Sequence, residues 1–118
     1  MERTTMYRDE HLSIEMTGSV EIDTRGLTLT RKEFELLAML ARNAGEIVPR
    51  NVLLSTVWGY CEGTRTRTLD VHIRRLRRKM GALGETYIQT VFGIGYRFER
   101  YRAPRPILTF SPVYSASA

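Results

Sequence analysis

The sequence predicts an α+β domain with a short N-terminal antiparallel sheet, three helices and a C-terminal β-hairpin. Between Thr30 and Met80, apolar residues recur three and four positions apart in three successive segments, which is the spacing of amphipathic helices. Before and after these segments, short runs of alternating apolar and polar residues are separated by turns that contain glycine, as in strands. The last helical segment also concentrates the positive charge of the chain.

Length and composition limit the class of protein. A chain of 118 residues forms one domain with a single core, and contents of 42% hydrophobic and 26% charged residues are ordinary for a globular protein. No run approaches 18 apolar residues and no N-terminal signal pattern is present, so a cytoplasmic location is expected. The single cysteine, Cys61, excludes an internal disulfide and a cysteine-cluster metal site, and no cofactor is expected.

The N-terminal part is expected to form three or four short strands. Met1 to Thr5 has no pattern. From Met6 to Leu29, strands are expected in turn at Met6 to Arg8, Leu12 to Met16, Val20 to Ile22 and Leu27 to Leu29. Gly18 and Ser19 form one expected turn, and Arg25 and Gly26 form another.

Two helices follow. Thr30 and Glu33 have the spacing of a capping box, so the first helix should begin at Thr30, and Gly45 should end it. Its expected apolar face consists of Phe34, Leu36, Leu37, Leu40, Ala41 and Ala44. A short extended link, Glu46 to Val48, leads to Pro49, which suits the start of a second helix that ends near Trp58.

The third helical segment, Thr64 to Met80, is an amphipathic rod of positive charge. It has seven basic residues and one acid, a net charge of +6, whereas the whole chain is +5. The residues outside it therefore sum to −1. One narrow apolar stripe runs along it, formed by Leu69, Ile73, Leu76 and Met80. The chain is thus a nearly neutral scaffold that carries one cationic helix.

The face opposite that stripe is expected to bind nucleic acid. It gathers Arg67, Thr68, Val71, Arg74, Arg75 and Arg78. Val71 lies among the arginines, where its methyl groups suit contact with a thymine methyl group in a major groove. Asp70 lies one turn before Arg74, so an i,i+4 ion pair between them is expected. The concentration of the charge excess on one helix favours DNA binding over a merely solvated basic face.

A hairpin and a tail complete the chain. Tyr87 to Val91 and Gly95 to Phe98 are expected strands. Gly93 and Gly95 should let the turn adopt positive φ and let its backbone approach another surface closely. The domain is expected to span residues 6–100, and the proline-containing segment 101–118 to be an extended or disordered tail. Three helices, the third basic, followed by a hairpin describe a winged helix-turn-helix.

Four segments carry a resemblance to a known family. LTRKEFELLAMLARNAGEIVPR, VLLSTVWG, TRTLDVHIRRLRRKM and IQTVFGIGYRF closely resemble the effector domain of OmpR/PhoB-type response regulators over roughly Tyr7 to Arg100. The resemblance implies a four-stranded N-terminal sheet and transcriptional regulation by binding to tandem DNA repeats. It also implies a recognition helix in the major groove and a wing in the adjacent minor groove.

The resemblance extends to individual residues and partners. The helix residues already named match its DNA-binding surface together with Asp70 and His72, and Trp58 matches a phosphate-contacting tryptophan. Further contacts are expected from Lys79, Arg50, Thr90, Phe92 and Gly93. From residue type alone, Trp58 could equally belong to the core. The loop Tyr60 to Thr64 matches one that touches RNA polymerase in activators. The family also implies a free monomer that pairs on DNA, and a phosphorylatable receiver domain that is absent from these residues. The sequence is therefore expected to be either a C-terminal fragment of a longer regulator or a protein without a receiver.

The sequence departs from the family at two positions. The wing usually carries an arginine after Thr-Val, where this chain has Phe92, and a polar N-cap usually stands where it has Pro49. Arginine readout of the minor groove is therefore not expected at the tip. The Phe92 ring could pack on sugar rings or only stabilise the hairpin.

Other functions are less well supported by the sequence. No HExxH, GxSxG or phosphate-binding loop occurs, so the chain is not expected to be an enzyme. No aromatic residues alternate with the arginines, which disfavours RNA. The main alternative is a protein-interaction module that docks an acidic partner through the basic helix. A steep, log-linear loss of affinity with salt would distinguish DNA from that partner.

Overall fold

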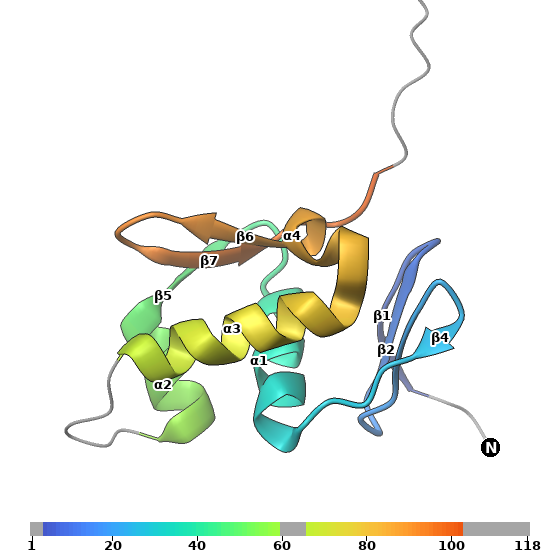
Figure 1. Cartoon of the computed structure of the whole chain (residues 1–118), viewed down its shortest axis with the longest axis horizontal. Helices are drawn as coiled ribbons and strands as arrows, with labels where there is room; N and C mark the ends of the chain where they lie inside the picture. Colours follow the sequence, from blue (N-terminus) through green and yellow to red (C-terminus); the bar gives the residue numbers. More distant parts are fainter. Residues whose placement is uncertain (1–3, 60–65, 103–118) are drawn as a thin grey trace, which may run out of the picture.

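The computed structural model describes residues 4–59 and 66–102. Four strands, β1 (Thr5–Arg8), β2 (Leu12–Glu15), β3 (Val20–Ile22) and β4 (Arg25–Gly26), form an antiparallel sheet in that order. Two helices follow, α1 (Arg31–Arg42) and α2 (Arg50–Trp58), with strand β5 (Ile47–Pro49) between them. The basic helix α3 (Thr66–Met80) lies across the middle of the molecule, with the N-terminal sheet near its C-terminal end (Figure 1).

The chain then returns along α3. A 3-10 turn, η1 (Gly81–Leu83), and a short helix, α4 (Gly84–Tyr87), precede strands β6 (Ile88–Val91) and β7 (Gly95–Phe98). These two strands form the expected hairpin, which runs along one side of α3 (Figure 1). The predicted α+β architecture with three main helices and a C-terminal hairpin is confirmed.

Several boundaries differ from the sequence predictions. The last N-terminal strand is Arg25–Gly26 rather than Leu27 to Leu29, because the chain reverses earlier, at Asp23 and Thr24, which have φ values of 51° and 64°. Tyr87 ends α4 and does not begin the following strand. The supposed link before α2 is a strand, since β5 pairs with β7 and makes the wing a three-stranded sheet in the order β5-β7-β6.

The first helix begins as the sequence predicts. The Thr30 hydroxyl accepts a hydrogen bond from the backbone N–H of Glu33, and the Glu33 carboxylate accepts one from the N–H of Thr30. Two otherwise unpaired backbone donors are satisfied in this way. The helix ends at Arg42, with Asn43 as its C-cap, before the predicted stop at Gly45.

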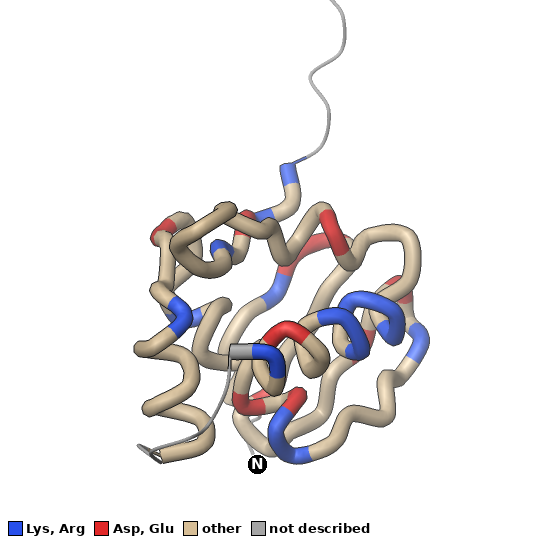
Figure 2. Tube along the Cα trace, turned by 60° about the vertical axis from the view of Figure 1, so that its left-hand side comes forward, with Lys and Arg blue, Asp and Glu red and all other residues tan. Residues whose placement is uncertain are grey.

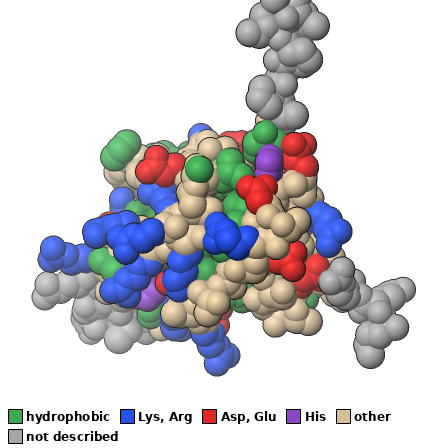
Figure 3. Space-filling model, turned by 45° about the vertical axis from the view of Figure 1, so that its right-hand side comes forward, with side chains coloured by type: hydrophobic (Ala, Val, Ile, Leu, Met, Phe, Trp, Pro, Cys, Tyr) green, Lys and Arg blue, Asp and Glu red, His purple; other side chains and the backbone are tan. Residues whose placement is uncertain are grey.

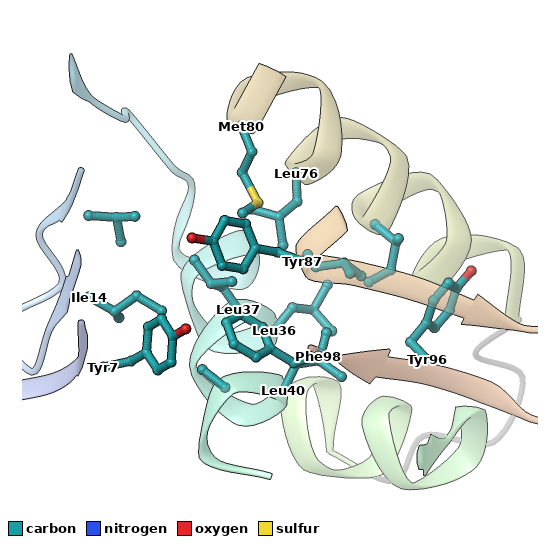
Figure 4. Close-up of a cluster of buried hydrophobic side chains, with 14 of the residues drawn as sticks. Tyr7, Ile14, Leu36, Leu37, Leu40, Leu76, Met80, Tyr87, Tyr96 and Phe98 are labelled. Carbon is teal, nitrogen blue, oxygen red and sulfur yellow. The ribbon is translucent and has the colours of Figure 1, made fainter. Parts of the chain in front are cut away.

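The core lies between α1, α3 and the strands. Leu36, Leu37 and Leu40 of α1 are fully buried, as are Leu69 and Leu76 of the predicted α3 stripe. In Figure 4, side chains of α1 and α3 point toward Tyr87 and Phe98. The apolar stripe of α3 is therefore buried in the core, and the opposite face of the helix is exposed to solvent.

The N-terminal sheet is fastened to this core by aromatic residues. Tyr7 of β1 packs edge-on against Phe98 of β7, with ring centroids 5.1 Å apart. The hydroxyl groups of Tyr7 and Tyr87 both donate to the Asp9 carboxylate. Burial, followed by its hydrogen bond to Asp9, raises the pKa of Tyr87 above its usual range. Tyr101, placed in the tail by the sequence analysis, packs edge-on against His11 at 4.4 Å.

No helix in the described part of the chain is long and apolar enough to cross a lipid bilayer.

Candidate nucleic-acid interface

The outer face of α3 is an exposed row of arginines. Successive residues of a helix are rotated by about 100°, and the residues opposite the buried stripe are Arg67, Arg74, Arg75 and Arg78. All four side chains are exposed, and within residues 4–59 and 66–102 none of them forms an ion pair. Figure 2 shows the basic residues along α3, and Figure 3 shows Lys and Arg side chains gathered over it. Thr68 and Val71 are half-buried on this side.

A groove continues the basic surface at the C-terminal half of α3. Its volume is about 440 Å³, and it is lined by Arg74, Arg77, Arg78, Gly81, Ala82 and Glu85. Three guanidinium groups and one carboxylate give this groove a net positive charge. It suits an anionic group such as a backbone phosphate.

Asp70 does not pair with Arg74, contrary to the sequence prediction. Its carboxylate accepts hydrogen bonds from the Arg50 guanidinium of α2 and from the Tyr96 hydroxyl of β7. Asp70 lies about 100° from the apolar stripe, on the flank of α3 that faces the wing, and these partners approach from that side. The ion pair between Arg50 and Asp70 thus joins α2 to α3, and contact of Arg50 with DNA stays a prediction.

Arg77 fastens the same flank of α3 to the wing. Its Nε and Nη2 atoms donate to the Ile88 carbonyl oxygen at 2.9 and 2.7 Å, and Nη2 donates to the Thr90 hydroxyl at 2.8 Å. The Thr90 hydroxyl thus accepts a hydrogen bond from Arg77, and its predicted contact with DNA stays a prediction. The sequence analysis gave Arg77 no role, although its helical angle places it beside Asp70.

The ring of Tyr96 lies between two cations. The guanidinium carbons of Arg50 and Arg77 are 5.3 and 5.6 Å from its ring centroid. Burial and the hydrogen bond to Asp70 raise the pKa of Tyr96, so its hydroxyl keeps its proton and remains a donor. We call Arg50, Asp70, Arg77 and Tyr96 the wing latch, because they tie α2, α3 and the wing sheet together.

The opposite flank of α3 faces α2. The Nδ1 atom of His72 lies 2.8 Å from the Thr68 carbonyl oxygen, and its ring packs edge-on against Trp58 at 5.0 Å. Trp58 is half-buried and packs against the core, so its ring is shared between core and surface. Lys32 donates to the Val57 carbonyl at 2.7 Å, with its ammonium 5.9 Å from the Trp58 ring. Contact of Trp58 or His72 with a phosphate stays a prediction.

The Lys79 ammonium is bound within the domain and not on the arginine row, which argues against the DNA contact predicted for it. Its ammonium donates to the Glu33 carboxylate at 2.7 Å and to the Thr28 carbonyl at 2.9 Å. Burial raises the pKa of Glu33, but hydrogen bonds from Lys79 and from the Thr30 N–H lower it more, and the net shift is downward. Lys79 therefore secures α3 to the start of α1.

The tip of the wing is apolar and exposed. Phe92 is 89% exposed and Ile94 is 49% exposed. Gly93 has a φ of +79°, which L side chains rarely adopt, and a Cβ atom on Gly95 would lie 2.0 Å from the Val48 carbonyl oxygen. Both roles predicted for these glycines are confirmed, and the surface that Gly95 approaches is β5 of the same domain.

Three sequence predictions lie outside the described residues. They are the loop Tyr60 to Thr64, matched to a polymerase contact, the thiol of Cys61, and the extended or disordered tail beyond residue 102. In the described part of the chain, no group of three or more His, Cys, Asp or Glu side chains could hold a metal ion.

A basic helix that packs across two others, with a hairpin fastened along its side, defines the winged helix-turn-helix class. Residues 24–98 match the family described as "Transcriptional regulatory protein, C terminal". The chain belongs to this family, so it is a domain of a transcriptional regulator and not an enzyme.

Individual relatives agree with this assignment. The transcriptional regulatory protein HprR of Escherichia coli K12 is 51% identical over 84 residues, which are 70% of this chain and 38% of HprR. The uncharacterized transcriptional regulatory protein YclJ of Bacillus subtilis is 45% identical over 71 residues, 60% of this chain and 31% of YclJ. The chain thus spans roughly a third of the length of these curated relatives.

Solved structures show the same fold. The DNA-binding domain of Klebsiella pneumoniae RstA, in complex with the RstA box, superposes with a TM-score of 0.70 at 32% identity. The match covers 80% of this chain and 96% of that domain. The Thermotoga maritima response regulator DrrB, an OmpR/PhoB homolog, superposes with a TM-score of 0.71 at 35% identity, covering 80% of this chain and 44% of DrrB.

Proposed function

We propose that this chain binds double-stranded DNA sequence-specifically, as the output domain of a two-component response regulator. The observation that carries the proposal is the arginine row of α3. Its four guanidinium groups are exposed and have no ion-pair partner in the described structure, on a helix that is about 22 Å long. A helix of this length crosses a major groove and reaches phosphates on both sides.

The position of each residue indicates which part of the DNA it would contact. Arg75, Arg78 and Val71, which face away from the core, would contact base edges, and Arg67 and Arg74 would contact base edges or phosphates. Trp58 and His72, on the α2 side, would lie against the sugar-phosphate backbone. The hairpin would stand near the adjacent minor groove with Phe92 and Gly93 at its tip. The RstA domain, which shares this fold, is bound to its DNA box in the solved complex.

The proposal extends to assembly and partners. We infer that the free chain is a monomer that pairs on direct repeats of its DNA site. We also infer that it acts in the cytoplasm. A receiver domain in the same regulator would control it, since the matched relatives are about three times as long as the matched segment. Contact with RNA polymerase through Tyr60 to Thr64 rests on the family resemblance alone. Sedimentation of the DNA-free chain as a tight dimer at micromolar concentration would contradict the monomer.

Selection of bound duplexes from a random pool, followed by mobility-shift titration of variants, tests the proposed function. Arg75→Ala and Arg78→Ala should each weaken specific binding by about 1–3 kcal/mol and relax specificity at one position if they contact a base. Val71→Ala should lose discrimination only at a thymine. Arg42→Ala, which removes an exposed arginine from the C-terminal end of α1, is the matched control.

The salt dependence of binding separates DNA from an acidic protein partner. For DNA, the logarithm of the association constant should fall linearly with the logarithm of salt concentration for duplexes of any sequence, and each phosphate-contacting arginine contributes about 0.9 to the slope. If no selected duplex binds, or if the three α3 variants bind as the wild type does, α3 does not enter the groove.

A further inference from the structure

The wing tip presents two apolar side chains to solvent, and its own sequence carries no charge. Phe92 is 89% exposed, Ile94 is 49% exposed, and the tip sequence from Val91 to Gly95 contains no ionisable residue. Ile94 N–H donates to the Val91 carbonyl at 3.0 Å, which closes a four-residue turn. Phe92 is the second residue of this turn and Gly93, with positive φ, is the third. The aromatic ring is thereby placed at the outermost point of the hairpin.

This tip is held rigidly on the DNA-binding helix. The Arg50 N–H donates to the Ile94 carbonyl at 3.0 Å, so one end of the turn is fixed to the start of α2. Gly95 is packed against the backbone of β5, too closely for any side chain. The wing latch then ties the strands that lead to the tip to α3 through Asp70 and Arg77. A force on Phe92 would therefore be transmitted to α3 and would not fold the hairpin back.

The wing tip could contact DNA either through charge or through its apolar side chains, and physical chemistry distinguishes the two. A wing that neutralises phosphates or exploits the negative potential of a narrow minor groove needs a cation, and this tip has none. An exposed phenylalanine is stabilised instead by contact with apolar surface, and the faces of the bases are the largest apolar surface of DNA, ahead of the sugar rings and the thymine methyl groups. Minor-groove proteins use Phe and Ile as wedges that open a base step and kink the duplex.

We propose that Phe92, supported by Ile94, inserts between two base pairs from the minor groove and kinks the duplex to which this domain binds. This inference rests on the proposed function, because the tip reaches the duplex only when α3 is seated in the groove. Opening a base step costs a few kcal/mol, so an inserted side chain must be held by a rigid support. The hydrogen-bonded turn and the wing latch provide that support.

The wedge would also contribute to sequence specificity. Pyrimidine–purine steps, such as TA and CA/TG, unstack and kink more easily than other steps. Because α3 and the tip move as one body, the kinked step should lie at a fixed distance from the bases read by Arg75 and Arg78. Selected duplexes should therefore show a flexible step at one flanking position that no hydrogen bond from the protein explains.

The test uses a selected duplex in which each adenine flanking the α3 site is replaced in turn by the fluorescent base 2-aminopurine. With the wild-type chain, fluorescence should rise several-fold at one step, which reports unstacking. Energy transfer between dyes on the two duplex ends should increase as the ends approach. Phe92→Ala should abolish both signals while the major-groove footprint persists, weaken binding by about tenfold, as for loss of one base–aromatic stack, and leave the salt slope unchanged.

Two further variants sharpen the result. Phe92→Leu keeps an apolar wedge, so it should retain part of the kink. Met16→Ala removes another exposed apolar side chain, 53% exposed beside the N-terminal sheet, and should bind and kink as the wild type does.

Each contrary outcome has a distinct meaning. If the wild type binds the duplex but no 2-aminopurine position responds, the wedge is wrong and the proposed function stands. If Phe92→Ala leaves base stacking unchanged but alters the number of chains per duplex, the tip contacts protein and the wedge is again wrong. If the wild type binds no selected duplex, both proposals fail.

Discussion

Replacing Lys79 by Met should destabilise the fold without weakening the electrostatic contact with DNA. Lys79 directly follows Arg78 in the sequence, so from charge alone both residues would be expected to contact DNA. In the structure, the Lys79 ammonium is bound to Glu33 and to the Thr28 carbonyl, whereas the Arg78 side chain is exposed on the outer face of α3. Methionine keeps the apolar stem of lysine and removes the charge.

The expected magnitude follows from the burial of the two partners. The Glu33 side chain is 3% exposed and that of Lys79 is 37% exposed. Removal of one partner from a fully buried ion pair costs about 3–5 kcal/mol, but solvent screens a pair with one partly exposed member. Glu33 also keeps its hydrogen bond from the Thr30 N–H. We therefore expect a loss of about 1–2 kcal/mol in the free energy of unfolding.

The pH dependence gives a second, independent signature. The pKa of Glu33 is lowered in the folded state from its ordinary value of 4.5. The unfolded chain therefore binds more protons at this group, and its stabilising contribution is present above pH 4.5 and is lost as pH falls through the lower folded pKa. Without Lys79, the folded pKa rises toward the ordinary value. The variant's free energy of unfolding should then change less steeply with pH in this acid window.

Urea denaturation at several pH values measures both effects, and salt-dependent mobility shifts supply the contrast. Lys79→Met should keep the wild-type salt slope. Arg78→Met, the neighbouring control, should keep wild-type stability within about 0.5 kcal/mol and should weaken specific DNA binding by about 1–3 kcal/mol. If Lys79→Met instead has wild-type stability and a salt slope reduced by about one, the ammonium contacts DNA and the argument from burial is refuted.

Two further predictions concern the wing. Tyr96→Phe removes only the hydroxyl that donates to Asp70, so it should cost about 0.5–1.5 kcal/mol of stability and should weaken specific binding at an unchanged salt slope; wild-type affinity in a titration would show that the latch does not position the wing. Phe92→Arg places a cation at the exposed tip, so it should steepen the salt slope by roughly one phosphate equivalent on the same duplex. An unchanged slope for Phe92→Arg would mean that the tip does not reach the DNA.

Local patterns in the sequence were sufficient for several features. The capping box at Thr30 and Glu33 depends on residues three positions apart, and it forms as predicted. The buried stripe and the exposed arginines of α3 follow from the 100° rotation between successive residues. The positive φ of Gly93 follows from the geometry of a tight turn. Such features are encoded within one segment, so the sequence alone could specify them.

Short or unpatterned elements escaped prediction. Strand β5 has three residues, too few for alternation to show, and it exists as a strand because β7 lies beside it. The early reversal at Asp23 and Thr24 required positive φ at two residues other than glycine, which turn signals do not indicate.

The partners of the charged residues on the flanks of α3 were decided by the tertiary structure. The sequence places Asp70 and Arg77 on one flank and His72 and Lys79 on the other, but it does not say what lies against each flank. Packing brings Arg50, Tyr96 and the wing to the first flank, and Trp58 and Glu33 to the second. Helical periodicity fixes the direction of a side chain, whereas its partner comes from a segment distant in sequence and is set by the packing of the whole domain.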